Sequence, residues 1–576
     1  MTTPQDDQAA AAGAAAEPTL LQRFLHWEAV QPEVVALTEP RPDGTVVDFT
    51  WREVGDQARR MATHLRSLGL PPASSIAILG RNSAHWIMAD LSIWMAGHVS
   101  VPIYPTASIA TIGHVLDHAQ VRLLFVGKLD SKAEAWDELR RALPPALPLV
   151  ALPMSPLAEP ALQWQALATA SAPLQQPHLA AAADLATIMY TSGTTGVPKG
   201  VMHSFGTMAR YAQGSGDFCG FTPADRLLSY LPLAHAAERS FVESNFLAHG
   251  LHVTFNDSLE TFAADLQRAR PTVFISMPRL WTLFYAGVCA KLPAPAQALL
   301  AAASAEGEAL RRQVLAGLGL ADTRLAFTGS APLPLEIVDW YRRLGLELLD
   351  VYGMTEDFCW SHYSRPGAVR LGYCGQVLPG VQARIADGGE IEVKAFTQML
   401  GYYKDPAQTE AALTADGFFR TGDRGEYDDA GRLRITGRVK ELFKTGKGKY
   451  VSPAPIENRF AHPTVEAVCV TGPGRAQPFA LLMPTAAARQ RLADAAGRAA
   501  LLAQWEALLA EVNAALEGHE RLSQVVVVED PWSIDKGFLT PTMKIRRSVI
   551  EQHYLARAAV WAALGRKVVL ETEGQA

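Results

Sequence analysis

Hydrophobic residues in the first quarter of the chain alternate between helical spacing and short apolar runs. Thr50 and Glu53 form a plausible capping box, and apolar residues then recur at helical spacing until Gly69. Asn82 is the expected cap of the next helix. The elements predicted after the first helix are strand, helix, strand, helix and strand at residues 75–79, 82–95, 99–103, 109–118 and 122–126. This alternation predicts a mostly parallel sheet covered by helices on both faces.

The rest of the chain divides into four regions by the same patterns. Residues 145–182 are rich in Ala, Pro and Leu with weak periodicity, which predicts a meandering connection. A second alternating region spans about residues 227–353. Short strands with turns then follow at 383–385, 389–393 and 431–435, which predicts antiparallel pairing. Strands near 465–470, 478–483 and 525–529, around one long helix over about residues 486–517, are sufficient for a small α+β domain.

At 576 residues the chain is too long for a single compact core. We therefore expect an α/β protein with a large N-terminal domain of mostly parallel sheets covered by helices, an antiparallel subdomain, and a separate small C-terminal α+β domain. Residues 1–18 contain an alanine run and two aspartates without a basic start. They are expected to form a disordered tail and not a signal peptide.

Composition excludes several classes of protein. With 49% hydrophobic residues, 19% charged residues and a formal charge of −6 without long single-sign runs, nothing indicates a nucleic-acid partner. Five scattered cysteines lack metal-ligand spacing, which favours a reduced, cytoplasmic setting. Residues 91–116 lack Asp, Glu, Lys and Arg, but their prolines, histidines and hydroxyls favour a buried helix and strand over a transmembrane segment. Peripheral attachment to the inner membrane face and the oligomeric state are left open.

A loop rich in glycine and hydroxyl groups follows the apolar run at 185–190, which is expected to be a buried strand. Glycine lets backbone N–H groups turn inward, hydroxyls donate, and a lysine adds a mobile charge, so the loop suits a polyphosphate. A polar surface turn is the plainer interpretation. A Walker A loop does not fit, because Pro198 and Gly200 disfavour an immediate helix. The candidate phosphate ligands are Thr191, Ser192, Gly193, Thr194, Thr195, Gly196 and Lys199.

Residues 190–200 resemble the phosphate-binding signature of the adenylate-forming superfamily, which includes acyl-CoA synthetases, luciferases and the adenylation domains of peptide synthetases. Further segments are similar to that superfamily in the same order, within about residues 20–560. They lie at 230–235, 271–279, 328–333, 350–356, 417–423, 435–444, 446–457 and 539–547. The ordered set is far more specific than any single match. Residues 443–445 and 450–453 look most like the long-chain fatty acyl branch.

The resemblance implies how ATP would bind. Tyr352 would stack on adenine, Asp423 would accept the ribose hydroxyls, and Arg438 would bind the ribose or a phosphate. Thr355 would contact a phosphate, and Glu356 would hold Mg²⁺, a hard cation that suits a carboxylate. The other ATP-binding or AMP-binding positions implied are Gly329, Ser330, Ala331, Gly353 and Met354. The small size of Gly329 and Ala331 fits a ligand or tight packing equally well.

The resemblance also implies the catalytic and CoA-binding residues. Lys544 would bridge the substrate carboxylate and the α-phosphate, beside Lys199, Thr355 and Glu356. His235 would border the acyl pocket, with a hydrogen-bonded core histidine as the alternative. The segment expected to close on CoA includes Gly448, Lys449 and Tyr450. Lys440 falls at the family's hinge, which would separate a large domain at residues 19–439 from a small mobile domain at 440–576.

The function implied is an ATP-dependent ligase that converts a medium- to long-chain fatty acid through acyl-AMP to acyl-CoA, using ATP, Mg²⁺ and CoA. Residues 238–243 lack the Asp that anchors the substrate amine in peptide-synthetase adenylation domains, so an amino acid is disfavoured. The alternatives are an acyl-AMP ligase that loads a carrier protein, an aryl or other carboxylate–CoA ligase, and a non-catalytic nucleotide or acyl sensor. Retention of Lys199, Glu356, Asp423, Arg438 and Lys544 argues against the sensor.

Overall fold

A seven-stranded sheet forms the centre of the N-terminal part of the chain in the computed structural model, which describes residues 17–129, 133–156, 162–191, 197–540 and 543–573. Its strand order is β18-β8-β7-β4-β3-β5-β6. In chain order the strands are β3 (Ser75–Leu79), β4 (Val99–Ile103), β5 (Leu123–Val126), β6 (Leu149–Ala151), β7 (Leu185–Thr191), β8 (Lys199–Ser204) and β18 (Gly401–Tyr402). The five strands from β6 to β7 in the sheet run parallel, and β8 and β18 add antiparallel pairs at one edge.

Two further sheets complete the large α/β part. One has the order β2-β1-β10-β9 and consists of β1 (Val35–Pro40), β2 (Val46–Thr50), β9 (Arg226–Ser229) and β10 (His252–Phe255). The other follows chain order through β11 (Val273–Ser276), β12 (Leu325–Gly329), β13 (Leu348–Tyr352), β14 (His362–Tyr363) and β15 (Gln376–Val377). Mixed parallel and antiparallel pairs occur in both. The prediction of mostly parallel sheets joined to helices is confirmed.

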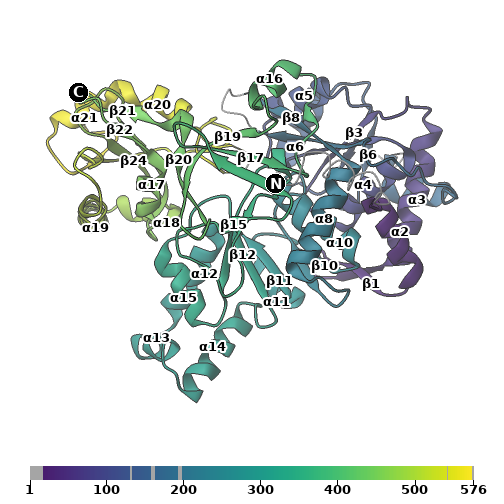
Figure 1. Cartoon of the computed structure of the whole chain (residues 1–576), viewed down its shortest axis with the longest axis horizontal. Helices are drawn as coiled ribbons and strands as arrows, with labels where there is room; N and C mark the ends of the chain where they lie inside the picture. The colour runs from purple at the N-terminus through teal and green to yellow at the C-terminus, as the bar shows by residue number, and fades with distance from the viewer. Residues whose placement is uncertain (1–16, 130–132, 157–161, 192–196, 541–542, 574–576) are drawn as a thin grey trace, which may run out of the picture.

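Helices surround these sheets (Figure 1). Those of the first half are α2 (Leu20–Val30), α3 (Trp51–Ser67), α4 (Ala84–Ala96), α5 (Ile109–His118), α6 (Ala133–Ala142), α7 (Trp164–Ala170), α8 (Phe205–Cys219), α9 (Ala236–Glu238) and α10 (Asn245–His249). Those that follow are α11 (Phe262–Ala269), α12 (Pro278–Lys291), α13 (Ala294–Leu300), α14 (Ala305–Gly317) and α15 (Leu335–Arg343). In the described parts of the chain, no helix has the length and apolar character needed to cross a bilayer.

The antiparallel subdomain has the strand order β16-β17-β19-β20. Its strands are β16 (Val381–Ile385), β17 (Glu390–Ala395), β19 (Phe419–Tyr427) and β20 (Leu433–Arg438), and α16 (Pro406–Ala412) lies between β17 and β19 in sequence. Three of these strands match the sequence prediction. The pattern missed β19, because Gly422 and Gly425 interrupt its apolar residues.

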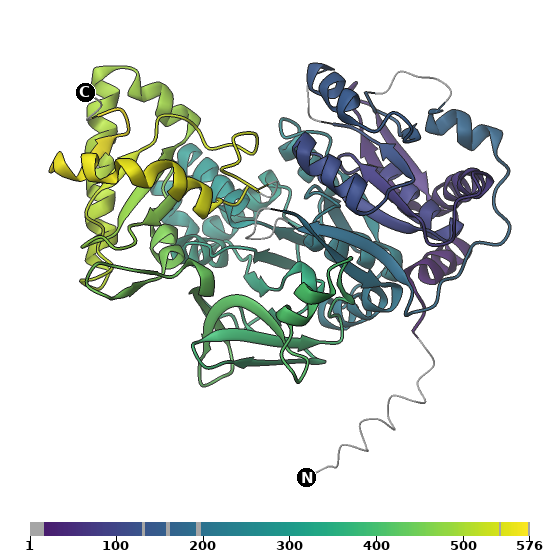
Figure 2. The same ribbon diagram turned by 90° about the horizontal axis from the view of Figure 1, so that it is seen from above.

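The last part of the chain forms a lobe beside the sheets that precede it (Figures 1 and 2). It contains the hairpin β21 (Phe443–Lys444) and β22 (Tyr450–Val451) and the sheet β23 (Val465–Thr471), β24 (Phe479–Pro484), β25 (Val525–Val527) and β26 (Val568–Leu570). Its helices are α17 (Pro453–Glu457), α18 (Ala486–Leu492), α19 (Ala495–Ala514), α20 (Arg547–Tyr554) and α21 (Ala558–Ala563). Two hydrophobic clusters occupy this lobe, and their described members all lie within residues 443–570.

Two sequence predictions about helix ends are wrong, for different physical reasons. Ser83 caps α4 by accepting from the Trp86 N–H at 3.1 Å, whereas Asn82 donates to the Ser229 hydroxyl and to a backbone carbonyl. The Asn82 side chain thus forms buried hydrogen bonds with residues far along the chain instead of capping the helix. The long helix expected at 486–517 is two helices, because the Asp494 carboxylate accepts from the Gly497 N–H at 2.8 Å and starts α19 anew.

Residues 145–182 are less irregular than predicted. The connection includes the short strand β6 and the short helix α7, whose Trp164 is buried. The Trp164 indole donates to the Gln57 side chain of α3 at 3.0 Å, which ties the connection to the main body. Weak periodicity therefore concealed two short elements that tertiary contacts stabilise.

Candidate active site

The glycine-rich segment lies between two antiparallel strands. Thr191 ends β7, Lys199 begins β8, and the two residues are paired across the ladder. No helix follows the lysine directly, in agreement with the argument against a Walker A loop. The predicted phosphate ligands Ser192, Gly193, Thr194, Thr195 and Gly196 lie outside the described residues. The hairpin geometry returns Lys199 to the side of Thr191.

Lys199 belongs to a corner that also contains Glu356 and Tyr402. The Lys199 ammonium lies 5.2 Å from the centroid of the Tyr402 ring, and the Tyr402 hydroxyl donates to Glu356 Oε1 at 2.8 Å. Desolvation lowers the pKa of Lys199, and the nearby Glu356 carboxylate opposes this shift. Desolvation raises the pKa of Glu356, opposed first by the Tyr402 hydrogen bond. An amine and a carboxylate from distant segments are thus held at one corner.

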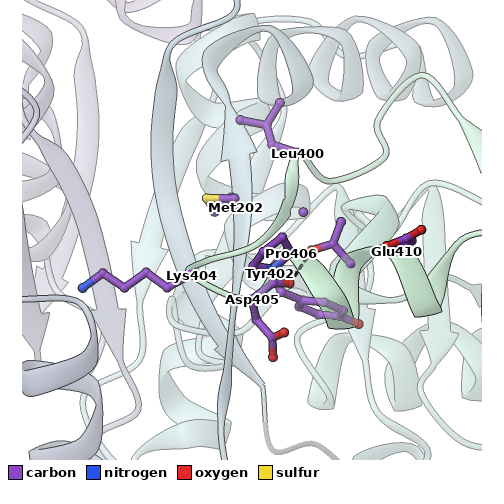
Figure 3. A pocket seen from close by; sticks show the side chains of 9 residues that line it. Met202, Leu400, Tyr402, Lys404, Asp405, Pro406 and Glu410 are labelled. Carbon is purple, nitrogen blue, oxygen red and sulfur yellow. Dashed lines mark hydrogen bonds between the residues drawn. The ribbon is translucent and has the colours of Figure 1, made fainter.

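Tyr402 is a site residue that sequence reasoning missed. It lies on the two-residue edge strand β18, too short to show an apolar period, so only its contacts reveal it. Tyr402 also lines a separate pocket of about 440 Å³ with Met202, Leu400 and Pro406 (Figure 3). Lys404 also lines this pocket, and in the same view its side chain points away from the other labelled residues.

The turn after β13 is fixed by close contacts of its backbone. The Thr355 carbonyl accepts from His203 Nε2 at 2.7 Å, and the Met354 N–H donates to the Asp357 carboxylate at 2.8 Å. A Cβ on Gly353 would lie 2.7 Å from Cys359 Cα, so a side chain does not fit there. These contacts place Glu356 beside Lys199. Burial lowers the pKa of His203 to about 4, so its ring is neutral near neutral pH.

Asp423 joins two of the predicted nucleotide ligands. Its carboxylate accepts from the Tyr352 hydroxyl at 2.9 Å and from Arg438 Nε at 2.7 Å. Asp423 lies on β19 and is paired with Arg438 on β20, while Tyr352 ends β13. The structure therefore brings together three residues that the resemblance assigned to adenine, to the ribose, and to the ribose or a phosphate of ATP. The arrangement offers an aromatic ring, a carboxylate and a guanidinium to a ligand.

The small residues after β12 are explained in part by packing. A Cβ on Gly329 would lie 2.7 Å from Val351 Cγ2 and 2.9 Å from its carbonyl oxygen, so tight packing alone requires glycine. Ser330 and Ala331 are exposed, and Ser330 has a φ of +68°. A non-glycine residue in this region of φ is uncommon and costs conformational energy.

His235 is a hydrogen-bonded histidine that still has access to solvent. It caps the short helix α9, where its Nδ1 accepts from the Ala237 N–H at 3.1 Å. The neutral ring therefore carries its hydrogen on Nε2. Burial lowers the pKa of His235 to about 4, and the charge of Lys544 lowers it further. Tyr104, which sequence reasoning also missed, lies edge-on to this ring with centroids 6.4 Å apart.

Lys544 comes from the C-terminal lobe, and its charge interacts with those of Arg438 and Asp423. The Thr540 N–H donates to the Lys544 carbonyl at 2.8 Å. Lys544 retains access to solvent, yet the surrounding protein removes enough water to lower the pKa of its ammonium group. Arg438 lowers that pKa further, and Asp423 opposes the shift. Lys544 is thus within electrostatic reach of both Arg438 and His235.

The predicted hinge and CoA residues lie on exposed segments of this lobe. Lys440 is in the turn after β20, and its charge contributes to the lowered pKa of Lys199. Gly448, Lys449 and Tyr450 belong to the hairpin of β21 and β22, with Gly448 at a φ of +76°. In the described chain, the hydrogen bonds of Lys449 connect to Thr445 of the same hairpin. The structure does not show these residues in contact with the Lys199 corner.

The donor set around Glu356 suits a magnesium ion bound together with substrate phosphates. Among the described residues there is no group of three or more His, Cys, Asp or Glu side chains that could hold a metal ion. Mg²⁺ normally binds through one or two carboxylates and completes its shell with water and phosphate oxygens. Glu356 is a half-buried carboxylate beside Lys199, and it fits that requirement.

Comparison with protein families defines the class. Residues 24–403 match the AMP-binding enzyme family, and residues 442–558 match the AMP-binding enzyme C-terminal domain. The chain belongs to this family, which confirms the resemblance to adenylate-forming enzymes.

Two named relatives and one solved structure show which proteins this chain is similar to. The chain is 31% identical to long-chain-fatty-acid–CoA ligase FadD15 of Mycobacterium bovis, over 89% of this chain and 92% of that protein. It is 27% identical to human long-chain-fatty-acid–CoA ligase 1, over 93% of this chain and 85% of that protein. Its fold is similar to the crystal structure of the adenylation domain of a carboxylate reductase from Mycobacterium chelonae, with a TM-score of 0.77 and 22% identity over 97% of this chain and 95% of that one.

Proposed function

We propose that this protein is an ATP-dependent acyl-CoA ligase that activates medium- to long-chain fatty acids through acyl-AMP. The observation that carries the proposal is the convergence of three groups from distant segments. Lys544 of the C-terminal lobe interacts through its charge with the pair of Asp423 and Arg438, which we assign to the nucleotide, and we assign the Lys199 corner to the phosphates. Relatives named as long-chain-fatty-acid–CoA ligases support the fatty-acid class.

In the first step a carboxylate oxygen of the substrate attacks the α-phosphorus of ATP in line. The new bond is the acyl–O–P linkage, and the bond to the bridging oxygen of pyrophosphate breaks. In this proposal the positive charge of Lys544 neutralises the carboxylate and the α-phosphate as charge develops. Lys199 steadies the leaving pyrophosphate. The lowered pKa of each lysine reflects a partly desolvated site, in which each remaining charge acts more strongly on the reaction.

Glu356 is the residue that would hold Mg²⁺. When bound, the ion supplies positive charge to the phosphate oxygens. The hydrogen bond from Tyr402 fixes the Glu356 carboxylate, and the close packing of Gly353 fixes the turn that carries it. These contacts orient the carboxylate before any ligand arrives.

In the second step the small domain, which we place at residues 440–576, turns about Lys440. Lys544 moves away from Asp423 and Arg438, and the hairpin with Gly448, Lys449 and Tyr450 takes its place against CoA. The CoA thiol releases its proton to water, its sulfur attacks the acyl carbon, and the bond between that carbon and the AMP oxygen breaks. Separate hydrophobic clusters within residues 443–570 support such a rigid rotation.

The acidic residues that follow His235 do not provide an anchor for a substrate amine. Glu238 is fully buried and accepts from the Ser229 hydroxyl at 2.7 Å and the Tyr230 N–H at 3.0 Å. Glu243 is also fully buried and pairs with Arg239 at 3.1 Å. Both carboxylates are engaged inside the protein, which supports a simple carboxylic acid over an amino acid.

The test is a panel of fatty acids of graded length and aryl acids, incubated with the purified protein, ATP and Mg²⁺, with and without CoA. We expect AMP and pyrophosphate release with fatty acids, and a thioester only when CoA is present. Lys544→Ala serves as the control for contaminating enzymes and should form no acyl-AMP. Acyl-AMP formation that is never followed by CoA thioester would instead indicate transfer to a carrier protein. A preference for aryl acids would reject the fatty-acid assignment.

A further inference from the structure

Helix α5 carries two histidines, His114 and His118, that belong to none of the motifs named above. They are four residues apart, so they lie on one face of the helix. Their rings stack with centroids 5.3 Å apart and an angle of 15° between the ring planes. Each ring meets a different end of the glycine-rich segment.

His114 contacts the peptide that leads into Lys199. Its Nε2 lies 3.0 Å from the carbonyl oxygen of Pro198. A carbonyl can only accept, so this ring nitrogen must carry a hydrogen and donate it. Pro198 immediately precedes Lys199, the first residue of β8. The imidazole thus fixes the peptide from which the Lys199 side chain projects.

His118 contacts the strand on the other side of the hairpin. Its Nδ1 lies 2.7 Å from the Tyr190 hydroxyl, and Tyr190 immediately precedes Thr191 at the end of β7. Burial, together with the charges of His114 and Lys404, lowers the pKa of His118. Burial also raises the pKa of Tyr190, so both groups are neutral near neutral pH. The bond is therefore a neutral hydrogen bond in a partly buried place.

The loop after β18 also contacts His118 and the start of β8. The Lys404 ammonium donates to the His118 carbonyl at 2.9 Å, and the Tyr403 ring lies edge-on to His118 at 5.7 Å. The Tyr403 N–H donates to the Gly200 carbonyl at 2.7 Å. A Cβ on Gly200 would lie 3.2 Å from the Tyr190 ring, so glycine is needed for this close approach. In Figure 1, α5 and β8 lie next to each other at this edge of the sheet.

From these contacts we propose that His114 and His118 are positioning residues for Lys199. They hold the ends of β7 and β8 at a fixed separation, so that the Lys199 ammonium stays over the Tyr402 ring and beside Glu356. Neither histidine touches the reacting atoms. The inference rests on the proposed function, in which Lys199 acts on the leaving pyrophosphate and so serves acyl-AMP formation but not thioester formation.

The test compares substitutions that differ in a single hydrogen bond. His114→Phe keeps the ring and removes the donor, whereas His114→Gln keeps an N–H that can reach the Pro198 carbonyl. We expect His114→Phe to lower kcat/KM for ATP in acyl-AMP formation by about fivefold, the effect of one lost hydrogen bond. Thioester formation from supplied acyl-AMP should be unchanged, and His114→Gln should restore most of the loss. His118→Phe and His118→Asn form the corresponding pair for the bond to Tyr190.

Gly113→Ala is the matched control on the same helix, because a Cβ there has nothing within 4 Å. It should leave both half-reactions at the wild-type rate. Equal loss of both half-reactions in His114→Phe would show a general structural role and overturn the inference. An unchanged kcat/KM for ATP, or a glutamine variant no better than phenylalanine, would overturn it as well. A wild-type protein that forms no acyl-AMP would overturn the proposed function itself.

Discussion

An ion pair between the C-terminal lobe and the preceding body gives a quantitative test of the proposed rotation. Arg279, the second residue of α12, pairs with Glu466 on β23 at 2.6 Å. The pair joins two segments on opposite sides of the proposed hinge at Lys440. In the proposed scheme the ion pair forms when Lys544 is beside Arg438 and Asp423, and it breaks when the small domain turns. Removing the pair should therefore disfavour acyl-AMP formation relative to thioester formation.

The size of the effect follows from the exposure of the two side chains. They are 61% and 24% exposed, and ion pairs of this kind contribute about 0.2–1 kcal/mol. That range corresponds to a factor of about 1.4–5 in the equilibrium between the two arrangements. Arg279 also lies at a helix N-terminus, where a positive charge is unfavourable by about 0.3–1 kcal/mol. A single Arg279 substitution therefore has two opposing effects, and a double-mutant cycle is needed to separate them.

The assay measures each half-reaction separately, as pyrophosphate release without CoA and as thioester formation from supplied acyl-AMP. Glu466→Gln should lower the ratio of the two rates by up to about fivefold at low ionic strength. The effect should vanish in about 1 M salt, where screening acts over about 3 Å. The double charge reversal Arg279→Glu with Glu466→Arg should recover the ratio. A coupling of zero at low salt would refute the idea that this pair favours the adenylation arrangement.

Three further changes test the packing and electrostatics of the site. Gly200→Ala places a Cβ 2.7 Å from Ile188 Cγ2 and should lower the free energy of unfolding by about 1–3 kcal/mol in urea titrations; an unchanged midpoint would contradict the packing argument. Because the pKa of Lys544 is lowered, the rate of acyl-AMP formation should fall as pH rises through a value below the pKa of free lysine, whereas the rate of thioester formation should not fall there. The same fall in both rates would mean that a group other than Lys544 titrates. Arg239→Met leaves its buried carboxylate partners unpaired and should lower the free energy of unfolding by about 3–5 kcal/mol in chemical denaturation. An unchanged free energy of unfolding would contradict this prediction and would mean that the carboxylates take up protons instead.

Sequence patterns correctly predicted the helices and strands that are defined by residues close together in the chain. The capping box of Thr50 and Glu53 is present, with the Thr50 N–H donating to the Glu53 carboxylate at 2.8 Å, and α3 ends two residues before Gly69. The apolar runs at β3 and β4 are fully buried strands, as predicted. In both cases residues close in sequence supply the capping and burial that define the element.

The sequence predictions fail where residues far apart in the chain determine the structure or the role of a side chain. Asn82 has the right chemistry for a cap, but its amide meets Ser229, far along the chain. Tyr402 shows no pattern because β18 has only two residues, and its role depends on Glu356 and Lys199. The motif order predicted that Tyr352, Asp423 and Arg438 would share one ligand, and the fold brings them into contact. The motifs thus predicted which residues would share a ligand. Only the fold shows the other residues, such as Tyr402, that contact and orient them.

The most direct test of the central claim follows the oxygen atoms of the carboxylate. The protein is incubated with ATP, Mg²⁺, CoA and a fatty acid labelled with ¹⁸O in both carboxylate oxygens, and the products are analysed by mass spectrometry. A path through acyl-AMP transfers one labelled oxygen to AMP and leaves the other in the thioester carbonyl. Unlabelled AMP, with the label in pyrophosphate or inorganic phosphate, would contradict the account.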